Sequence, residues 1–267
     1  MKPLVATVTP LLLLTTAIAN AGIVMEMVTS NASGQETDRT KIYAQSKKIR
    51  MEQGGDDASD GTMIFLGDKF LYVDHEDKSY VVMDEAMLDE VSTQMSAAMK
   101  EMEAQLANMP PEQRAMVEQM MKGQMQGMMG EQGDAPPPPR VESMGSGKWQ
   151  SHKCRQYAVY EGATKTQEVC AAELDDVDGS EELIEAFRNM AVYITKLTES
   201  LPMRGDERPN PVELMDQIDG FPVHTIDYDN GVVVSEMSLD SVLEQDLDEE
   251  LFAAPKGYRR QDPFGGR

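Results

Sequence analysis

The sequence predicts an α+β fold, a curved antiparallel half-barrel of about 10–11 strands with a helical hairpin insertion and a further helix covering the concave face. Two observations predict it. Short strand-like runs separated by turn residues fill the chain from Gly22 to Met83 and resume after Pro139. Between these regions, and again around residue 190, apolar residues recur with helical spacing. A sheet this large must curl, so helices on its concave side would enclose a cavity.

The strand-like runs of the first half are too close together to be anything but antiparallel neighbours. Turn sequences such as "NASG" and "HEDK" separate them, and a parallel pair would need a crossover of about a dozen residues or more. The central runs "MIFL", "FLYV" and "YVVM" are apolar at consecutive positions. Both faces of these strands should therefore be covered.

Residues 84–140 are predicted to form a methionine-rich helical insertion that ends in the polyproline spacer "GDAPPPPR". Pro110 and Pro111 separate its two helices, because proline cannot continue a helix but can begin one. We expect the part from about 84 to 130 to form a lid over the sheet. The apolar stripe of the first helix is Met83, Met87, Val91, Met95, Met99, Met102, Leu106 and Met109, and that of the second is Met116, Val117, Met120, Met121, Met125, Met128 and Met129.

The second half is predicted to add strands and two more helices. "RVESM" and the hairpin 152–160 with 164–172 continue the sheet, and a helix from about Glu181 to Leu201 has Ser180 as its candidate cap. "NPVE" begins a short helix that ends near Gly220. A last hairpin turns at Asn230 and Gly231, which supply the left-handed residues of a tight turn.

The ends of the chain predict export and a single domain. "MKPLVATVTPLLLLTTAIANAG" has the charged, apolar and small-residue order of a signal peptide, so residues 1–21 should be removed by cleavage after Ala21. Residues 22–258 would form one half-barrel domain, and 259–267 a disordered tail. We expect a periplasmic or secreted protein with no integral membrane segment, because no later stretch reaches about 18 apolar residues.

The composition of the chain excludes some classes of binding partner. The formal net charge of -23 disfavours nucleic acid, which needs clustered Lys and Arg on its binder. The two cysteines, Cys154 and Cys170, lie equally far from Gly162, which would place them opposite each other in a hairpin. In an oxidising compartment this spacing predicts a disulfide, whereas a metal or redox pair would favour a closer spacing such as C-x-x-C.

No catalytic or metal-binding motif stands out. The three histidines, His75, His152 and His224, have no second ligand or nucleophile at motif spacing, and the acidic turns "DDVDGSEE" and "GDDASDG" do not match the oxygen ladder of an EF-hand. A non-enzymatic protein with no cofactor and no metal site is therefore predicted.

The methionines suggest three alternatives. They pack inertly along helices, they bind Cu(I) or Ag(I) through Met116, Met120, Met121 and Met125, or they form an adaptable apolar surface. Their helical spacing favours packing, while the choice of methionine over leucine favours a surface that fits ligands of variable shape. The candidate ligand-binding residues are then Met87, Met95, Met99, Met102, Met116, Met120, Met121, Met125, Phe65, Phe70 and Tyr72.

The layout also resembles a known family. The segments "KIYAQSKKIRMEQ", "DGFPV" and "LFAAPKGYRRQDP", with Phe252, Pro255, Gly257 and Tyr258, look like the periplasmic lipoprotein-carrier superfamily of the LolA, LolB and LppX type. The likeness is closest to its exported bacterial relatives of unknown function with Met-rich helices. It implies a half-barrel closed by helices around a cavity for acyl chains. It also implies that an arginine of an early strand, here Arg50, holds the lid.

Together these observations predict a binding protein that holds a hydrophobic small molecule, such as a lipid or acyl chain, between a curved sheet and a Met-rich lid. A Met-based Cu(I) or Ag(I) binder is one alternative. An envelope protein that binds another envelope protein, with its lid as a docking face and no small ligand, is the other.

Overall fold

The computed structural model describes residues 21–54, 61–107, 110, 139–199 and 211–262. Within them the strands form a single 12-stranded sheet in the order β12-β6-β5-β4-β3-β2-β1-β11-β10-β9-β8-β7. The strands are β1 (Ala21–Asn31), β2 (Glu36–Gln45), β3 (Lys48–Gln53), β4 (Thr62–Phe65), β5 (Phe70–Asp74), β6 (Ser79–Met83), β7 (Arg140–Trp149), β8 (His152–Glu161), β9 (Thr164–Ala172), β10 (Phe221–Asp229), β11 (Val232–Asp246) and β12 (Arg259–Arg260). The helices are α1 (Glu85–Ala107), α3 (Ser180–Glu199) and α4 (Pro211–Gln217), with short 3-10 turns η1 (Leu174–Asp176) and η2 (Glu249–Phe252).

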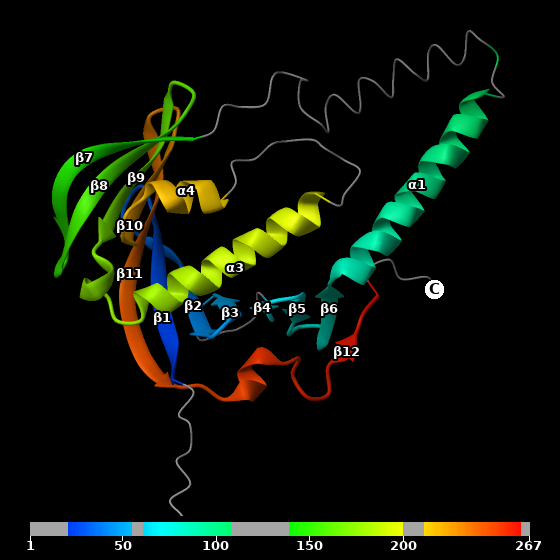
Figure 1. Ribbon diagram of the computed structural model, residues 1–267, viewed down its shortest axis with the longest axis horizontal. Coiled ribbons are helices and arrows are strands. Elements are labelled where there is room, and N and C mark those ends of the chain that lie inside the picture. Colours follow the sequence, from blue (N-terminus) through cyan, green and yellow to red (C-terminus); the bar gives the residue numbers. More distant parts are fainter. Residues whose placement is uncertain (1–20, 55–60, 108–109, 111–138, 200–210, 263–267) are drawn as a thin grey trace, which may run out of the picture.

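The α+β class and the antiparallel sheet predicted from the sequence are confirmed. The sheet is open, and its 12 strands slightly exceed the number predicted. Neighbouring strands pair antiparallel except for β12, which runs parallel to β6. The sheet curls, and α3 and α4 lie in its hollow (Figure 1). In the centre of the sheet β1 pairs with β11, and this pairing joins the first strands of the chain to strands that come much later in the sequence.

Helix α3 is the element that covers the concave face. Its apolar side packs on the sheet, with Leu183 and Ala186 fully buried and Phe187 and Met190 partly buried. The helix follows Gly179, whose φ of +68° suits glycine and whose missing Cβ leaves room for the side chain of Ile23. The predicted helix near Glu181–Leu201 is therefore confirmed over its described part, Ser180–Glu199.

The convex face of β1–β6 is covered by the chain that follows β11. Leu247 and Phe252 of this C-terminal segment pack against Val24, Ile64 and Val73. The segment ends in β12, which caps the edge strand β6. The prediction of a disordered tail from residue 259 is wrong at its start, because Arg259 and Arg260 pair with Ser79 and Tyr80.

Helix α1 is confirmed as a helix, but the predicted position of the lid is not. It follows β6 directly and projects away from the body of the molecule (Figure 1). Among its described side chains none is buried, and Met102 is 40% exposed. The described part of the predicted lid thus does not lie over the sheet. The predicted second helix and the spacer, residues 111–138, lie outside the described residues.

The disulfide between Cys154 and Cys170 is present, but not with the predicted register. Cys154 lies opposite Ala172, and Cys170 lies opposite Gln156, so the bond joins diagonal neighbours whose Cα atoms are 5.4 Å apart. The turn is centred between Gly162 and Ala163, and the register shifts again between Val159 and Tyr160. These two displacements explain why counting from Gly162 gave the wrong partners.

Candidate ligand-binding site

Two parallel rows of side chains cross the concave face beneath and beside α3. The first row is fully covered: Ile23, Ala44, Ile49, Phe65 and Phe70 are cross-strand neighbours and each is at most 4% exposed. Met83 continues the row and packs against the same cluster. Helix α3 lies directly on this row, because its Tyr193 ring is 5.6 Å from that of Phe65 and 5.7 Å from that of Phe70.

The second row is covered at one end only. Its members pair across β1 to β6, and exposure rises along the row from 3% at Met25 and 6% at Ile42 to 46% at Tyr72. Met51 and Met63 lie between these extremes and are partly buried. The complete row is Met25, Ile42, Met51, Met63, Tyr72 and Val81. We call its outer part, Met51, Met63, Tyr72 and Val81, the open row.

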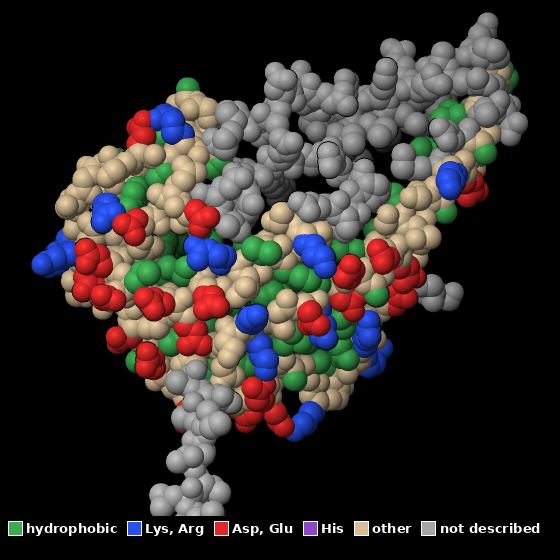
Figure 2. All heavy atoms as spheres, viewed as in Figure 1, with side chains coloured by type: hydrophobic (Ala, Val, Ile, Leu, Met, Phe, Trp, Pro, Cys, Tyr) green, Lys and Arg blue, Asp and Glu red, His purple; other side chains and the backbone are tan. Residues whose placement is uncertain are grey.

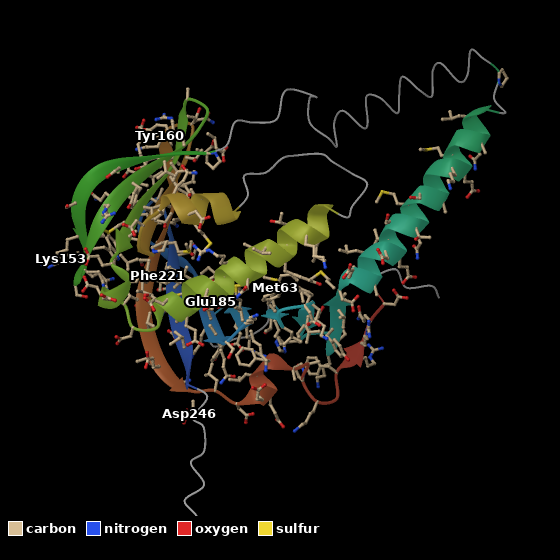
Figure 3. The ribbon with its side chains drawn as sticks, viewed as in Figure 1. Met63, Lys153, Tyr160, Glu185, Phe221 and Asp246 are labelled. Atoms are coloured by element: carbon tan, nitrogen blue, oxygen red, sulfur yellow. A yellow bond between two sulfur atoms is a disulfide. The ribbon has the colours of Figure 1, made fainter. Side chains whose placement is uncertain are left out.

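The open row is an apolar surface at the edge of the region covered by α3. Met63 lies on the sheet next to the helix (Figure 3), and hydrophobic side chains gather on the surface between α3 and the start of α1 (Figure 2). Met83 at the end of β6 and Met190 on α3 belong to the adjoining cluster. The methionines of the hollow are thus mainly those of the strands, and unbranched thioether side chains adapt readily to a neighbour's shape.

Helix α3 also carries two buried polar groups without partners among the described residues. Asn189 Nδ2 and Tyr193 Oη are buried and have no hydrogen-bond partner among the described residues. Residues four apart lie on the same face of a helix. A buried polar group left without a partner costs about 1–3 kcal/mol, so each such group calls for a physical explanation.

The surroundings of Tyr193 are apolar and negatively charged. Burial raises the pKa of its hydroxyl, and the carboxylates of Asp68, Asp84 and Glu85 raise it further. Glu85, at the start of α1, also forms an ion pair with Lys196 of α3, with 3.4 Å between Glu85 Oε2 and Lys196 Nζ. The hydroxyl therefore stays protonated at neutral pH and is available as a hydrogen-bond donor.

Only part of the predicted residue set comes together here. Phe65, Phe70 and Tyr72 lie on the concave face, the first two under α3 and the third in the open row. Met87 and Met95 are half-buried on α1, and Met102 is exposed; none of the three belongs to the cluster that packs under α3. The side chain of Met99, and Met116, Met120, Met121 and Met125, lie outside what the structure describes.

The role implied for Arg50 by the family resemblance is wrong for the described helices. Arg50 belongs to the convex face of β3, where its Nη1 donates to the carbonyl of Leu251 at 2.9 Å and its Nε pairs with Glu52 at 2.6 Å. The side chain is 12% exposed. Arg50 therefore fastens the C-terminal segment to the sheet, on the side opposite α3.

Sequence reasoning missed Met51, Met63 and Val81, and it missed Tyr193 and Asn189 of α3. The strand residues were hidden because apolar residues at consecutive positions do not say which face each one joins. The alternation in "KIRMEQ", where Met51 follows Arg50, carries the signal that could have assigned Met51 to the face opposite Arg50.

Two of the histidines have structural partners. His75 lies 2.8 Å from Thr62 Oγ1 and 3.0 Å from the hydroxyl of Tyr258, so it links the β5–β6 turn to the C-terminal segment. The His224 ring stacks on Trp149 with the ring centroids 3.6 Å apart. In the part of the chain that the structure describes, no three His, Cys, Asp or Glu side chains converge as a metal site would require.

No family model and no curated protein matches the chain. Among solved structures it is similar to an uncharacterized conserved protein from Thermus thermophilus, at 8% identity over 91% of both chains with a TM-score of 0.43. It is also similar to PNGF-II, at 10% identity and a TM-score of 0.37, covering 91% of this chain and 31% of that one. A LolA superfamily protein from Nitrosomonas europaea matches at 7% identity over 88% of this chain and 91% of that chain, with a TM-score of 0.29. These similarities are distant and do not assign the chain to a family.

None of the described helices is both long enough and apolar enough to cross a membrane.

Proposed function

We propose that this chain is an exported, non-enzymatic binding protein that holds a hydrophobic ligand, such as a lipid or acyl chain, between α3 and the concave face of the sheet. The observation that supports this most is the open row. Met51, Met63 and Tyr72 extend a buried apolar row beyond the edge of α3 and leave it partly exposed. Contiguous apolar surface of this kind marks binding sites on soluble proteins.

The energetics of such a site are those of apolar burial. Each methylene that an acyl chain buries against the open row contributes about 0.8 kcal/mol. Methionine suits this task, because a flexible, polarizable side chain can follow chains of different length and shape. The partly buried methionines of this cluster are Met51, Met63, Met83 and Met190, and Met51 and Met63 belong to the open row.

Asn189 and Tyr193 would give the site its polar contacts. The amide nitrogen of Asn189 and the hydroxyl of Tyr193 are buried without partners among the described residues. A ligand that brings a carbonyl or hydroxyl oxygen next to these donors would remove the cost of two unsatisfied groups. The carboxylates near Tyr193 make this position less favourable for an anion. The ligand is therefore expected to present a neutral acceptor to α3.

Export rests on two features. The disulfide Cys154–Cys170 is the kind of bond that persists in oxidising compartments. The apolar, lightly charged N-terminal sequence, which lies outside the described residues, has the order of a signal peptide.

The test is native mass spectrometry of the full chain, first as purified and then after delipidation and incubation with the methyl ester of palmitic acid. The Met63→Glu variant places a charge in the open row, and Met144→Glu makes the same change at the exposed edge strand β7, where Met144 is 46% exposed. We expect ester binding by the wild type and by Met144→Glu, and loss of binding in Met63→Glu with its thermal unfolding still cooperative. Equal binding by both variants, or none by the wild type, would contradict the proposal.

A further variant separates apolar packing from sulfur chemistry. Met63→Leu keeps the apolar area but removes the thioether, so it should retain the ester. If Met63→Leu loses binding as completely as Met63→Glu, the sulfur atom itself is required, and the proposal of an adaptable apolar surface is wrong.

A further inference from the structure

A second site lies at the other end of the molecule, between α4 and strands β8 to β10. It is an open pocket of about 370 Å³, lined by Pro139, Val159, Glu161, Thr166, Gln167, Leu214, Asp227 and Tyr228. This volume lies at the small end of the range of ligand sites, which is about 300–1,000 Å³. The pocket is close to the hairpin end of β8 that Tyr160 marks in Figure 3. It shares no residue with the open row.

A carboxylate in this pocket is fixed in place by neutral donors. Val159, Gln167, Asp227 and Ser235 are cross-strand neighbours on β8, β9, β10 and β11. Gln167 Nε2 donates to Asp227 Oδ1 at 2.9 Å, and Ser235 Oγ donates to Asp227 Oδ2 at 2.7 Å. Each carboxylate oxygen can accept a further hydrogen bond. Asp227 is therefore oriented before any ligand arrives, with acceptor capacity to spare.

The carboxylate of Asp227 forms no ion pair among the described residues. Among the described residues no Lys, Arg or His forms an ion pair with Asp227 or with the second pocket carboxylate, Glu161. The neighbouring Lys165 is paired with Glu168 at 2.5 Å instead, and its ammonium lies 4.0 Å from the centre of the Tyr228 ring. A partly buried carboxylate without a counter-ion favours the binding of a cation.

The rest of the lining is apolar or aromatic. Val159, Leu214 and Pro139 offer carbon surface, and Tyr228 offers a ring that already attracts the ammonium of Lys165. A bare metal ion would gain little from such walls, whereas an ammonium group attached to a short carbon chain would use both the acids and the apolar surface. The net charge of -23 further raises the local concentration of cations.

We infer that the pocket formed by β8, β9, β10 and α4 binds a small organic amine, with Asp227 accepting from its ammonium group, Glu161 adding charge at the rim and Val159 and Leu214 packing on its carbon chain. This site is separate from the one proposed for the hydrophobic ligand, so either one can exist without the other.

The experiment is isothermal titration of the full chain with 1,4-diaminobutane, using 1,4-butanediol as the uncharged probe of the same length. The wild type should bind the diamine saturably and should not bind the diol. Asp227→Asn keeps the size of the side chain and removes its charge; its one oxygen can still accept from Gln167, and its amide nitrogen can donate to Ser235 Oγ in place of the present contact. It should therefore weaken diamine binding by about tenfold or more. Glu161→Gln, at an exposed rim position, should weaken it less.

The control is Asp77→Asn, which removes the same charge from an exposed turn between β5 and β6. It should leave the affinity within about twofold, because a distant surface charge is screened by salt. The inference is overturned if the wild type does not bind the diamine saturably. It is also overturned if Asp77→Asn weakens binding as much as Asp227→Asn, since the effect is then one of net charge, or if neither Asp227→Asn nor Glu161→Gln changes it.

Discussion

Tyr193 shows how one side chain can be well packed and poorly satisfied at once. Its ring closes the aromatic cluster with Phe65 and Phe70, while its hydroxyl is buried without a partner among the described residues. Packing fixes the ring position, so the hydroxyl cannot turn to water. A group in this position lowers the stability of the ligand-free fold, and it is the kind of feature that a binding site retains.

The change Tyr193→Phe is therefore expected to stabilise the protein, although most substitutions of buried residues destabilise it. Removal of an unsatisfied buried hydroxyl should raise the free energy of unfolding by about 1 kcal/mol, measured by urea denaturation at pH 7. The control is Tyr72→Phe, whose residue is 46% exposed and whose change should be nearly neutral. A loss of stability in Tyr193→Phe would show that the hydroxyl has a partner after all.

The same variant tests the raised pKa. A hydroxyl whose folded pKa exceeds the ordinary value of 10.0 contributes stability at lower pH, and this contribution is lost as the pH rises from that value through the folded pKa. Unfolding free energies measured between about pH 8 and 11 should fall less steeply for Tyr193→Phe than for the wild type. Burial also raises the pKa of Tyr43. Part of the loss of stability at alkaline pH should therefore remain in both proteins.

At the scale of elements, local periodicity predicted what the helices are but not where all of them lie. The apolar spacing around residue 190 predicted α3, and Leu183, Phe187, Met190 and Leu197 belong to its packed side, whereas Ile194 of the same spacing is 37% exposed. The methionine stripe of α1 predicted a helix equally well, yet its described part projects away from the sheet. An apolar stripe indicates that one side of a helix is apolar, but it does not indicate which surface that side packs against.

The C-terminal segment was the element least visible in the sequence. Its residues 247–258 have neither helical nor strand periodicity over a useful length, but they cover the convex face through Leu247 and Phe252. Arg50 holds this segment through the carbonyl of Leu251. The family resemblance implied that Arg50 holds the lid, whereas the partners of Arg50 that the structure describes are the Leu251 carbonyl and Glu52.

Arg50→Met tests this assignment, since methionine keeps much of the carbon stem but removes both polar contacts. We expect a loss of about 1–2 kcal/mol in unfolding free energy, because the Leu251 carbonyl and Glu52 lose their partner. Hydrogen exchange should accelerate in residues 247–258 and stay unchanged in α3. The control Lys256→Met breaks only the exposed ion pair with Glu250 and should have little effect. Faster hydrogen exchange confined to α3 would contradict this assignment and would instead support a role of Arg50 in holding a helix over the sheet.

At the scale of the whole molecule, the two faces of the sheet are covered unequally. The convex face of β1–β6 carries a fixed segment that ends by pairing with β6, whereas the concave face carries α3 over one row and leaves the next partly open. The sequence predicted a curved sheet with a hollow. It could not predict which rows α3 would leave open, because that depends on the pairing of β1 with β11 and on the crossing of α3, both set by contacts distant in the chain.

The central claim is that the hydrophobic ligand lies along the open row, beside the edge of α3. The most direct test is photo-crosslinking of the full chain with a palmitoyl methyl ester that carries a diazirine, followed by peptide mapping. The claim predicts adducts on β3 to β6 around Met51, Met63 and Tyr72, and on α3 near Tyr193. Adducts confined to the convex side, such as the C-terminal segment, or adducts that saturate equally in Met63→Glu, would contradict it.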